Sequence, residues 1–187
     1  MNRRDLEKAI REVGRRVGLD YFYVIGSAAV FASLPEADSA ALTGTRDVDV
    51  IPSPPRPADA EGLANQVDFV LGEGSVFDIE NGFYVQGVDI STPSFAPKGW
   101  QARAKPVRSG GYTALCMEIH DLAVSKYGAG REKDLEFTRA LVRDGHLDKQ
   151  LLQERCAEVQ ADQARRELIH RRIDADFAGS TSMTPSP

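Results

Sequence analysis

The spacing of apolar residues changes along the chain between a helical period and a strand period, which predicts a mixed architecture. Near the N-terminus, a helix over 2–18 has one apolar face, which consists of Leu6, Ile10, Val13 and Val17. The opposite face is basic and consists of Arg4, Lys8, Arg11 and Arg15. We interpret the basic face as solvated, with contact to RNA as the alternative.

After this helix, short apolar runs predict strands, and longer segments with helical spacing predict further helices. The predicted strands are 21–25, 47–51, 83–90, 102–107 and 113–117. The predicted helices beyond the first are 28–32, 59–72, 119–128, 131–144 and 148–177. This order of elements predicts an α/β (α+β) fold with a mixed β-sheet, helices packed on one side of the sheet, and a helical C-terminal region.

The composition is that of one compact soluble domain, with 187 residues of which 42% are hydrophobic and 27% charged. We expect a single domain over 1–177, with its core at about 20–146, and a disordered tail over 178–187. No apolar run approaches the ~18 residues of a membrane span. The N-terminus also lacks the apolar core of a signal peptide, so the expected location is the cytoplasm.

The balance of charge limits the partners that the surface favours. The chain has 23 Lys and Arg against 28 Asp and Glu, a net charge of −5, which argues against nucleic-acid binding over the whole surface. A local basic groove is compatible with this charge. Cys116 and Cys156 lie far apart with no histidine at metal-ligand spacing, which indicates reduced thiols. His120, at a predicted helix start, is expected to serve in capping or to be exposed rather than to act in catalysis.

Two acidic residues occupy alternate positions of the predicted strand 47–51. Asp47 and Asp49 leave the same face of this strand, while Val48 and Val50 point into a core. Two carboxylates held side by side repel each other unless a cation lies between them, and Mg²⁺ takes such oxygen ligands together with substrate phosphates. We therefore interpret the pair as a metal site, with a solvated strand end as the alternative.

A glycine and a serine follow the first predicted strand, 21–25. Gly26 lets the backbone come close to a ligand, and the Ser27 hydroxyl and the amides after it can donate to phosphate oxygens. The alternative is an ordinary strand-to-helix turn in which Ser27 caps the helix. Because an acidic strand comes next in the chain, the order favours a phosphate cradle that faces a metal site.

A third segment carries basic residues on both sides of a glycine-rich break. Lys126 belongs to the predicted helix 119–128, and Arg131 follows Gly128 and Gly130. Each glycine inside a helix costs about 1 kcal/mol, which indicates that another group approaches the backbone closely. We expect the two cations to face a triphosphate or an RNA backbone. The alternative explanation of the glycines is the approach of another helix.

Three motifs can be taken together: Val24-Ile25-Gly26-Ser27, Asp47-Val48-Asp49-Val50, and Lys126 with Arg131-Glu132-Lys133-Asp134. Together they resemble the nucleotidyltransferase superfamily, which has the fold of DNA polymerase β. The chain is most similar to a small group of uncharacterised bacterial nucleotidyltransferase-like proteins, distantly related to the AbiEii-type toxins of toxin–antitoxin systems. The resemblance covers about residues 20–156, and further phrases that fit this group are 82–88, 97–100 with Arg103, and 120–126.

The resemblance implies a reaction in which a hydroxyl attacks the α-phosphate of a nucleoside triphosphate and pyrophosphate leaves. It implies that the glycine–serine turn holds the triphosphate and that Asp47 and Asp49 bind two Mg²⁺ ions. A third carboxylate on a neighbouring strand would activate the hydroxyl. By analogy, Lys126 and Arg131 would neutralise the charge of the triphosphate.

The sequence departs from the superfamily pattern in two places. The stretch between Ser27 and Asp47 is longer than usual, with 35–44 as the apparent insertion. The third carboxylate is also not fixed by a motif. Its candidates are Asp89 as first choice, Asp78 and Glu80 as alternatives, and Glu73 as a minor candidate.

The function expected from these residues is Mg²⁺-dependent transfer of a nucleoside monophosphate to an unidentified hydroxyl acceptor, for which RNA or tRNA is one candidate. One alternative is a toxin with the same chemistry, controlled by an antitoxin protein. Another is a catalytically silent nucleotide-binding or interaction module that lacks the third carboxylate. A glycosyltransferase with a metal-binding Asp-x-Asp pair is the last alternative, although it would give the glycine–serine turn no role.

Overall fold

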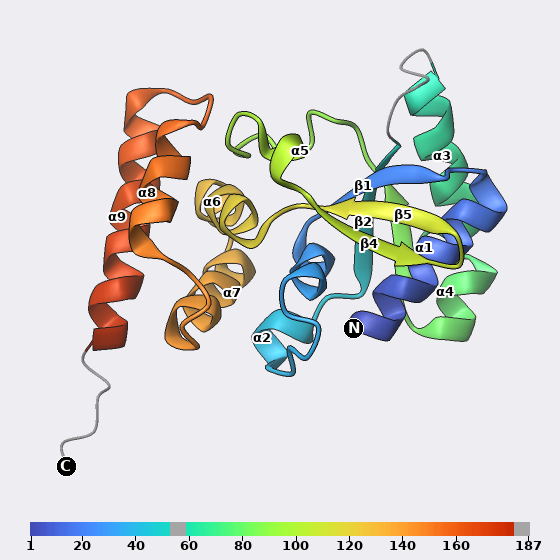
Figure 1. Cartoon of the computed structure of the whole chain (residues 1–187), viewed down its shortest axis with the longest axis horizontal. Coiled ribbons are helices and arrows are strands. Elements are labelled where there is room, and N and C mark those ends of the chain that lie inside the picture. The colour runs from blue at the N-terminus through green and yellow to red at the C-terminus, as the bar shows by residue number, and fades with distance from the viewer. Residues whose placement is uncertain (53–58, 182–187) are drawn as a thin grey trace. The chain divides into compact units, whose positions relative to one another are not determined.

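The computed structural model describes residues 1–52 and 59–181, and these form two compact units (Figure 1). The sheet unit consists of Met1–Pro93 and Gln101–Glu118. The helical unit consists of Ser94–Trp100 and the chain from Ile119 onward. That the two units form one domain over 1–177 stays a prediction.

The sheet unit is built on five strands in the order β3-β2-β1-β5-β4. The strands are β1 (Tyr21–Ile25), β2 (Asp47–Pro52), β3 (Tyr84–Gly87), β4 (Lys105–Ser109) and β5 (Tyr112–Cys116). β1 pairs parallel with β5 and β2 pairs parallel with β3, whereas the β1–β2 and β4–β5 pairs are antiparallel. The predicted mixed sheet is therefore confirmed.

The helices of the sheet unit are mostly short. They are α1 (Arg3–Val17), the 3₁₀ helix η1 (Ser27–Ala32), α2 (Ala40–Thr43), α3 (Ala60–Leu71) and α4 (Val76–Asn81). A further short helix, α5 (Trp100–Arg103), spans the point where the chain passes from one unit to the other. α1 begins at an Asn2 capping box and ends at Gly18 in the left-handed conformation, which matches the helix predicted over 2–18.

One face of the sheet carries the core of this unit. Its fully buried side chains include Phe22, Val24, Val48, Val50, Val85 and Ala114. α1 packs so closely that a side-chain carbon at Gly14 would lie 2.2 Å from the ring of Tyr112 on β5. α3 packs equally closely, because such a carbon at Gly87 would lie 2.1 Å from the carbonyl oxygen of Ala64. The expected packing of helices on one side of the sheet is confirmed for α1 and α3, and the acidic positions of β2 lie on the other face.

In the described part of the helical unit, up to Thr181, four helices pack together, and α6 and α9 each contact the other three. They are α6 (Ile119–Ala129), α7 (Glu132–Arg143), α8 (Lys149–Ala157) and α9 (Gln163–Thr181). Gly128, in the last turn of α6, and Gly130, between α6 and α7, do allow a close approach. A side-chain carbon at Gly128 would lie 2.3 Å from Phe95, and one at Gly130 would lie 2.1 Å from the guanidinium of Arg172 on α9.

The single helix predicted over 148–177 is wrong, because the chain forms α8 and α9 with a break over 158–162. In the break, Val159 is buried and forms an isolated β-bridge with Pro97. The side chain of Asp162 then accepts a hydrogen bond from the Arg165 amide at 2.7 Å and caps the new helix. α9 runs to Thr181, so 178–181 are not the predicted disordered tail, and 182–187 lie outside the described residues.

Other element boundaries also differ from the predictions. The predicted strand 83–90 ends at Gly87, and the predicted strand 102–107 is instead α5 followed by β4. The helix expected over 28–32 is a 3₁₀ helix that begins at Ser27. α2 and α4 were not predicted, although α4 carries a Ser75 cap and ends at Gly82 in the left-handed conformation.

Candidate active site

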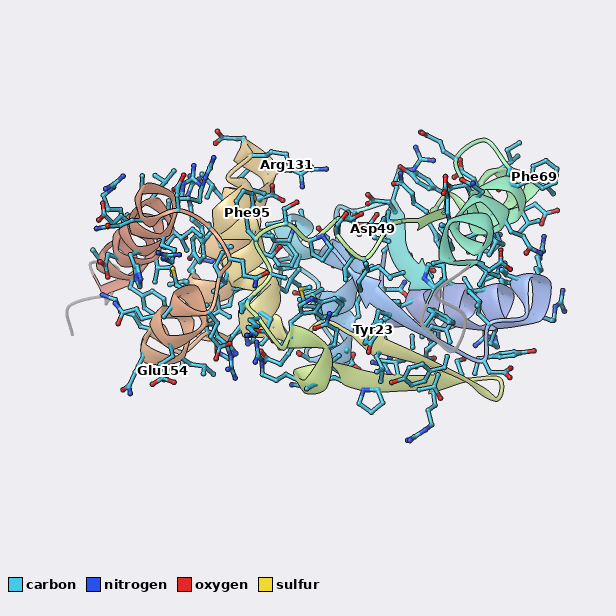
Figure 2. The ribbon with its side chains drawn as sticks, turned by 90° about the horizontal axis from the view of Figure 1, so that it is seen from above. Tyr23, Asp49, Phe69, Phe95, Arg131 and Glu154 are labelled. Carbon is cyan, nitrogen blue, oxygen red and sulfur yellow. The ribbon has the colours of Figure 1, made fainter. Side chains whose placement is uncertain are left out.

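The two acidic residues of β2 lie on the face of the sheet opposite the core. Val48 and Val50 are fully buried, whereas Asp47 and Asp49 are half-buried. Asp49 pairs with Ile25, the last residue of β1. Because the two strands are antiparallel, the turn that follows β1 lies beside the acidic end of β2. Figure 2 labels Asp49 among the side chains of the sheet unit.

The turn after β1 approaches the carboxylate of Asp49 more closely than any residue but glycine would allow. Gly26 has φ 68° and ψ −169°, a conformation essentially restricted to glycine. A side-chain carbon at this position would lie 2.3 Å from Asp49 Oδ2. Ser27 begins η1 directly after Gly26. The structure thus brings together three residues that the sequence selected as a phosphate cradle and a metal site.

Two further polar side chains border the acidic pair. The Thr45 hydroxyl donates a hydrogen bond to Asp47 Oδ1. Tyr84 of β3 stands directly opposite Asp47. Burial raises the pKa of the Tyr84 phenol, and the negative charges of Asp47, Glu73 and Asp49 raise it further. Tyr84 therefore stays protonated as a hydrogen-bond donor beside the carboxylates. The charge of Glu73 acts on Tyr84 together with those of Asp47 and Asp49.

Asp89, the first choice for the third carboxylate, lies beyond the end of β3 in an exposed turn. Its Oδ1 accepts a hydrogen bond from the Ser91 amide at 2.8 Å. Hydrogen bonds from Ser91 lower the pKa of Asp89, so the side chain is ionised at neutral pH. The predicted strand would have carried Asp89 onto the sheet, but strand pairing ends before the chain reaches it.

The alternatives to Asp89 lie on α4. Asp78 is buried, its carboxylate contacts Arg46 Nη2 at 3.0 Å, and it accepts a hydrogen bond from the Gly74 amide at 3.0 Å. These partners give Asp78 a structural role, because it ties the start of β2 to the turn before α4. Glu80 is exposed on the same helix.

The donor set of β2 fits a hard divalent cation. Among the described residues, no group of three or more His, Cys, Asp or Glu side chains is placed to hold a metal ion. Mg²⁺ does not require such a group, because it commonly binds one or two carboxylates and completes its shell with waters and substrate phosphates. Asp47 and Asp49 would hold this ion, and the close approach of Gly26 to Asp49 leaves backbone rather than side chain beside it.

In the helical unit, Lys126 and Arg131 converge on one carboxylate. Asp134 is fully buried, and its oxygens lie 3.1 Å from Lys126 Nζ and 2.6 Å from Arg131 Nε. Lys126 also lies over the ring of Phe137, 4.3 Å from its centroid. The sequence indicated the two cations but missed Asp134 and Phe137 as their partners, although all four belong to one helix pair.

Burial and charge act against each other in this cluster. Burial lowers the pKa of Lys126, and the charge of Asp134 only partly offsets that effect. For Asp134, burial alone would raise the pKa, but the hydrogen bond from Arg131 and the charge of Lys126 outweigh it and lower the pKa. Arg131, labelled in Figure 2, keeps 66% of its side chain exposed, so part of the cluster's positive charge faces solvent.

Several other sequence candidates have structural roles. His120 Nε2 accepts a hydrogen bond from the Asp148 amide at 3.0 Å, so it supports the start of α8 and not the start of its own helix. Burial raises the pKa of the Cys116 thiol to about 12 and that of Cys156 to about 11. On the basic face of α1, Lys8 donates to Asn81 and Arg11 to Ser109.

The comparisons with known proteins give one match. Residues 4–176 match the family described as nucleotidyltransferase of unknown function (DUF6036). The chain belongs to this family. Comparison with curated proteins and with solved structures gave no match.

This family membership confirms the superfamily inferred from the three motifs and leaves the acceptor open. None of the described helices combines the length and the apolar character that a membrane span requires.

Proposed function

We propose that this member of the nucleotidyltransferase family transfers a nucleoside monophosphate from a nucleoside triphosphate to a hydroxyl acceptor in a Mg²⁺-dependent reaction. The observation that carries the proposal is the approach of the Gly26 turn to Asp49, which joins a phosphate-binding backbone to a metal-binding carboxylate. Family membership supports the reaction class, and this local geometry supports the residues.

The roles of the residues follow from their chemistry. Asp47 and Asp49 would hold Mg²⁺, which would stabilise the attacking and the leaving oxygens. The Gly26 amide and the Ser27 hydroxyl orient the triphosphate by donating to its oxygens. Tyr84, which stands opposite Asp47 and stays protonated, is available as a hydrogen-bond donor beside the acidic pair.

The bond changes are those of an in-line displacement. The acceptor oxygen forms a bond to the α-phosphorus, and the bond from that phosphorus to the oxygen of the β-phosphate breaks, which releases pyrophosphate. Asp89 is the proposed acceptor of the hydroxyl proton, and its hydrogen bonds with Ser91 keep it ionised but make it a weaker base. Arg131, whose side chain is 66% exposed, is proposed to offset triphosphate charge, whereas Lys126 is buried against Asp134 and does not take the role expected for it.

Label transfer tests the proposal. The protein is incubated with Mg²⁺, each of the four α-labelled nucleoside triphosphates, and bacterial RNA and protein as acceptors. We expect label on one acceptor class, lost in an Asp47→Asn/Asp49→Asn variant. A Glu36→Gln/Glu61→Gln variant is the matched control, because it removes two exposed carboxylates from the same unit.

The result also separates the alternatives. Label on RNA together with growth arrest on expression would support the toxin with an antitoxin partner, which has the same chemistry. No label from any nucleotide, with Mg²⁺-dependent nucleotide binding retained, would overturn the transferase and support a silent binding module. Label that persists in the Asp47→Asn/Asp49→Asn variant would reject the site.

A further inference from the structure

The strand next to the acidic pair presents a neutral side chain to it. In the parallel ladder between β2 and β3, Gln86 stands directly opposite Asp49, and Tyr84 stands opposite Asp47. Neighbouring strands are about 4.8 Å apart, and residues directly opposite each other share a face. Gln86 is exposed, so its amide is not committed to the core. It therefore lies level with Asp49 on the acidic face.

Neither of the two residues paired with Asp49 in the sheet is a carboxylate. On the opposite side of β2, its ladder partner is Ile25, which is apolar and buried. Asp89 follows the end of β3 and is hydrogen-bonded to Ser91, while Asp78 is paired with Arg46. Within residues 1–52 and 59–181, no three acidic, histidine or cysteine side chains are grouped to hold a metal. The ladder position nearest to Asp49 is thus filled by an amide.

We infer that Gln86 supplies the third protein ligand of the cation bound by Asp47 and Asp49, through its side-chain amide oxygen. This inference rests on the proposed function and defines the charge of its metal site. A glutamine oxygen is a hard donor that carries no charge. The protein then contributes two negative charges to the site rather than three.

The neutral ligand has a consequence for binding order. With only two negative charges, the free protein holds a divalent cation weakly, and the phosphates of the nucleotide supply the missing charge. Metal therefore binds mainly together with the nucleotide. A carboxylate placed at position 86 would remove this dependence, because it would restore a third charge next to Asp49.

Binding of Mn²⁺ alone, followed by the paramagnetic resonance of the free ion, tests the inference without any turnover. In Gln86→Glu the side chain keeps its length and gains a charge, so we expect the Mn²⁺ dissociation constant to fall at least about tenfold. Gln86→Leu removes the donor at similar size and should raise the dissociation constant about threefold or more. Thr113→Glu is the control, because it adds a carboxylate to the same face on β5, outside the ladder of Asp49.

The outcomes separate this inference from the proposed function. The inference is supported if Gln86→Glu binds Mn²⁺ more tightly than Thr113→Glu does and if Gln86→Leu binds it more weakly than the native protein does. The inference is overturned if both glutamate variants bind Mn²⁺ equally more tightly, or if Gln86→Leu binds Mn²⁺ as the native protein does. If the Asp47→Asn/Asp49→Asn variant binds Mn²⁺ as the native protein does, the metal site of the proposed function fails. Circular dichroism melting of each variant checks that it is folded.

Discussion

At the scale of single residues, Gly26 leaves no room for a side chain beside Asp49. A Gly26→Ala change would force a side-chain carbon into the space of Asp49 Oδ2 and into a backbone conformation that costs about 1–3 kcal/mol. We expect a lower unfolding midpoint together with loss of Mn²⁺ binding.

Gly18→Ala is the control for this change. Gly18 also has positive φ but nothing within 4 Å of the added carbon, so its variant should lose stability and retain metal binding. Equal effects of the two variants on Mn²⁺ binding would contradict the close approach.

Asp89 provides the second prediction at this scale. General-base catalysis contributes about 10²- to 10⁴-fold to a rate, and the hydrogen bonds from Ser91 make Asp89 a weak base. We therefore expect Asp89→Asn to lower kcat by about 100-fold, near the lower limit of that range, with the nucleotide KM unchanged.

Asp68→Asn serves as its control. Asp68 accepts a hydrogen bond from the Gly87 amide at 2.8 Å, so this variant removes a carboxylate that supports β3 from its other side. A loss of less than fivefold in Asp89→Asn would assign the proton transfer to another group or to water.

At the scale of elements, the α6–α7 pair depends on one buried ion cluster. Asp134→Asn leaves the Lys126 ammonium, which is only 8% exposed, without its carboxylate. Removing one partner of a buried pair costs about 3–5 kcal/mol, which chemical denaturation at pH 7 would measure. Asp144→Asn is the control, because its partner Arg143 is 55% exposed and the loss should stay below about 1 kcal/mol.

The pH dependence of the same variant follows from the direction of the Asp134 shift. The pKa of Asp134 is lower in the folded protein than in the unfolded chain, so its stabilisation is complete above about pH 4 and is lost as the pH falls through the folded pKa. The difference in free energy of unfolding between native protein and Asp134→Asn should therefore shrink below about pH 4. A constant difference down to pH 2 would contradict the ion cluster.

The elements also show what the sequence could predict. The strands that carry Asp49 and Ile25, and the helix of Lys126, follow from local apolar periodicity. The neighbours Tyr84 and Gln86 do not, because strand register is set by long-range pairing that one sequence does not reveal. The motif pattern therefore selected the two carboxylates that are proposed to bind metal, whereas the neutral side chain opposite Asp49 required the structure.

At the scale of the whole molecule, each of the two units contains one buried cysteine, so thiol labelling measures the opening of each unit separately. Cys116 is buried in the sheet unit and Cys156 in the helical unit, and burial raises the pKa of the thiols to about 12 and about 11. Because the thiolate is the reactive form, both should resist a disulfide reagent at pH 8 until their unit opens. Single-cysteine variants, Cys116→Ala and Cys156→Ala, make each labelling rate measurable.

Nucleotide with Mg²⁺ should change these rates in a way that tests the roles proposed for both units. A ligand that binds only the native state suppresses opening, so labelling of Cys116 should slow, and the slowing should disappear in Asp47→Asn/Asp49→Asn. The role proposed for Arg131 requires the nucleotide to stabilise the helical unit as well, so Cys156 should also be protected. In Arg131→Gln, nucleotide should then no longer slow the labelling of Cys156, while Cys116 stays protected. Protection of Cys116 alone in the native protein would reject a phosphate contact by Arg131.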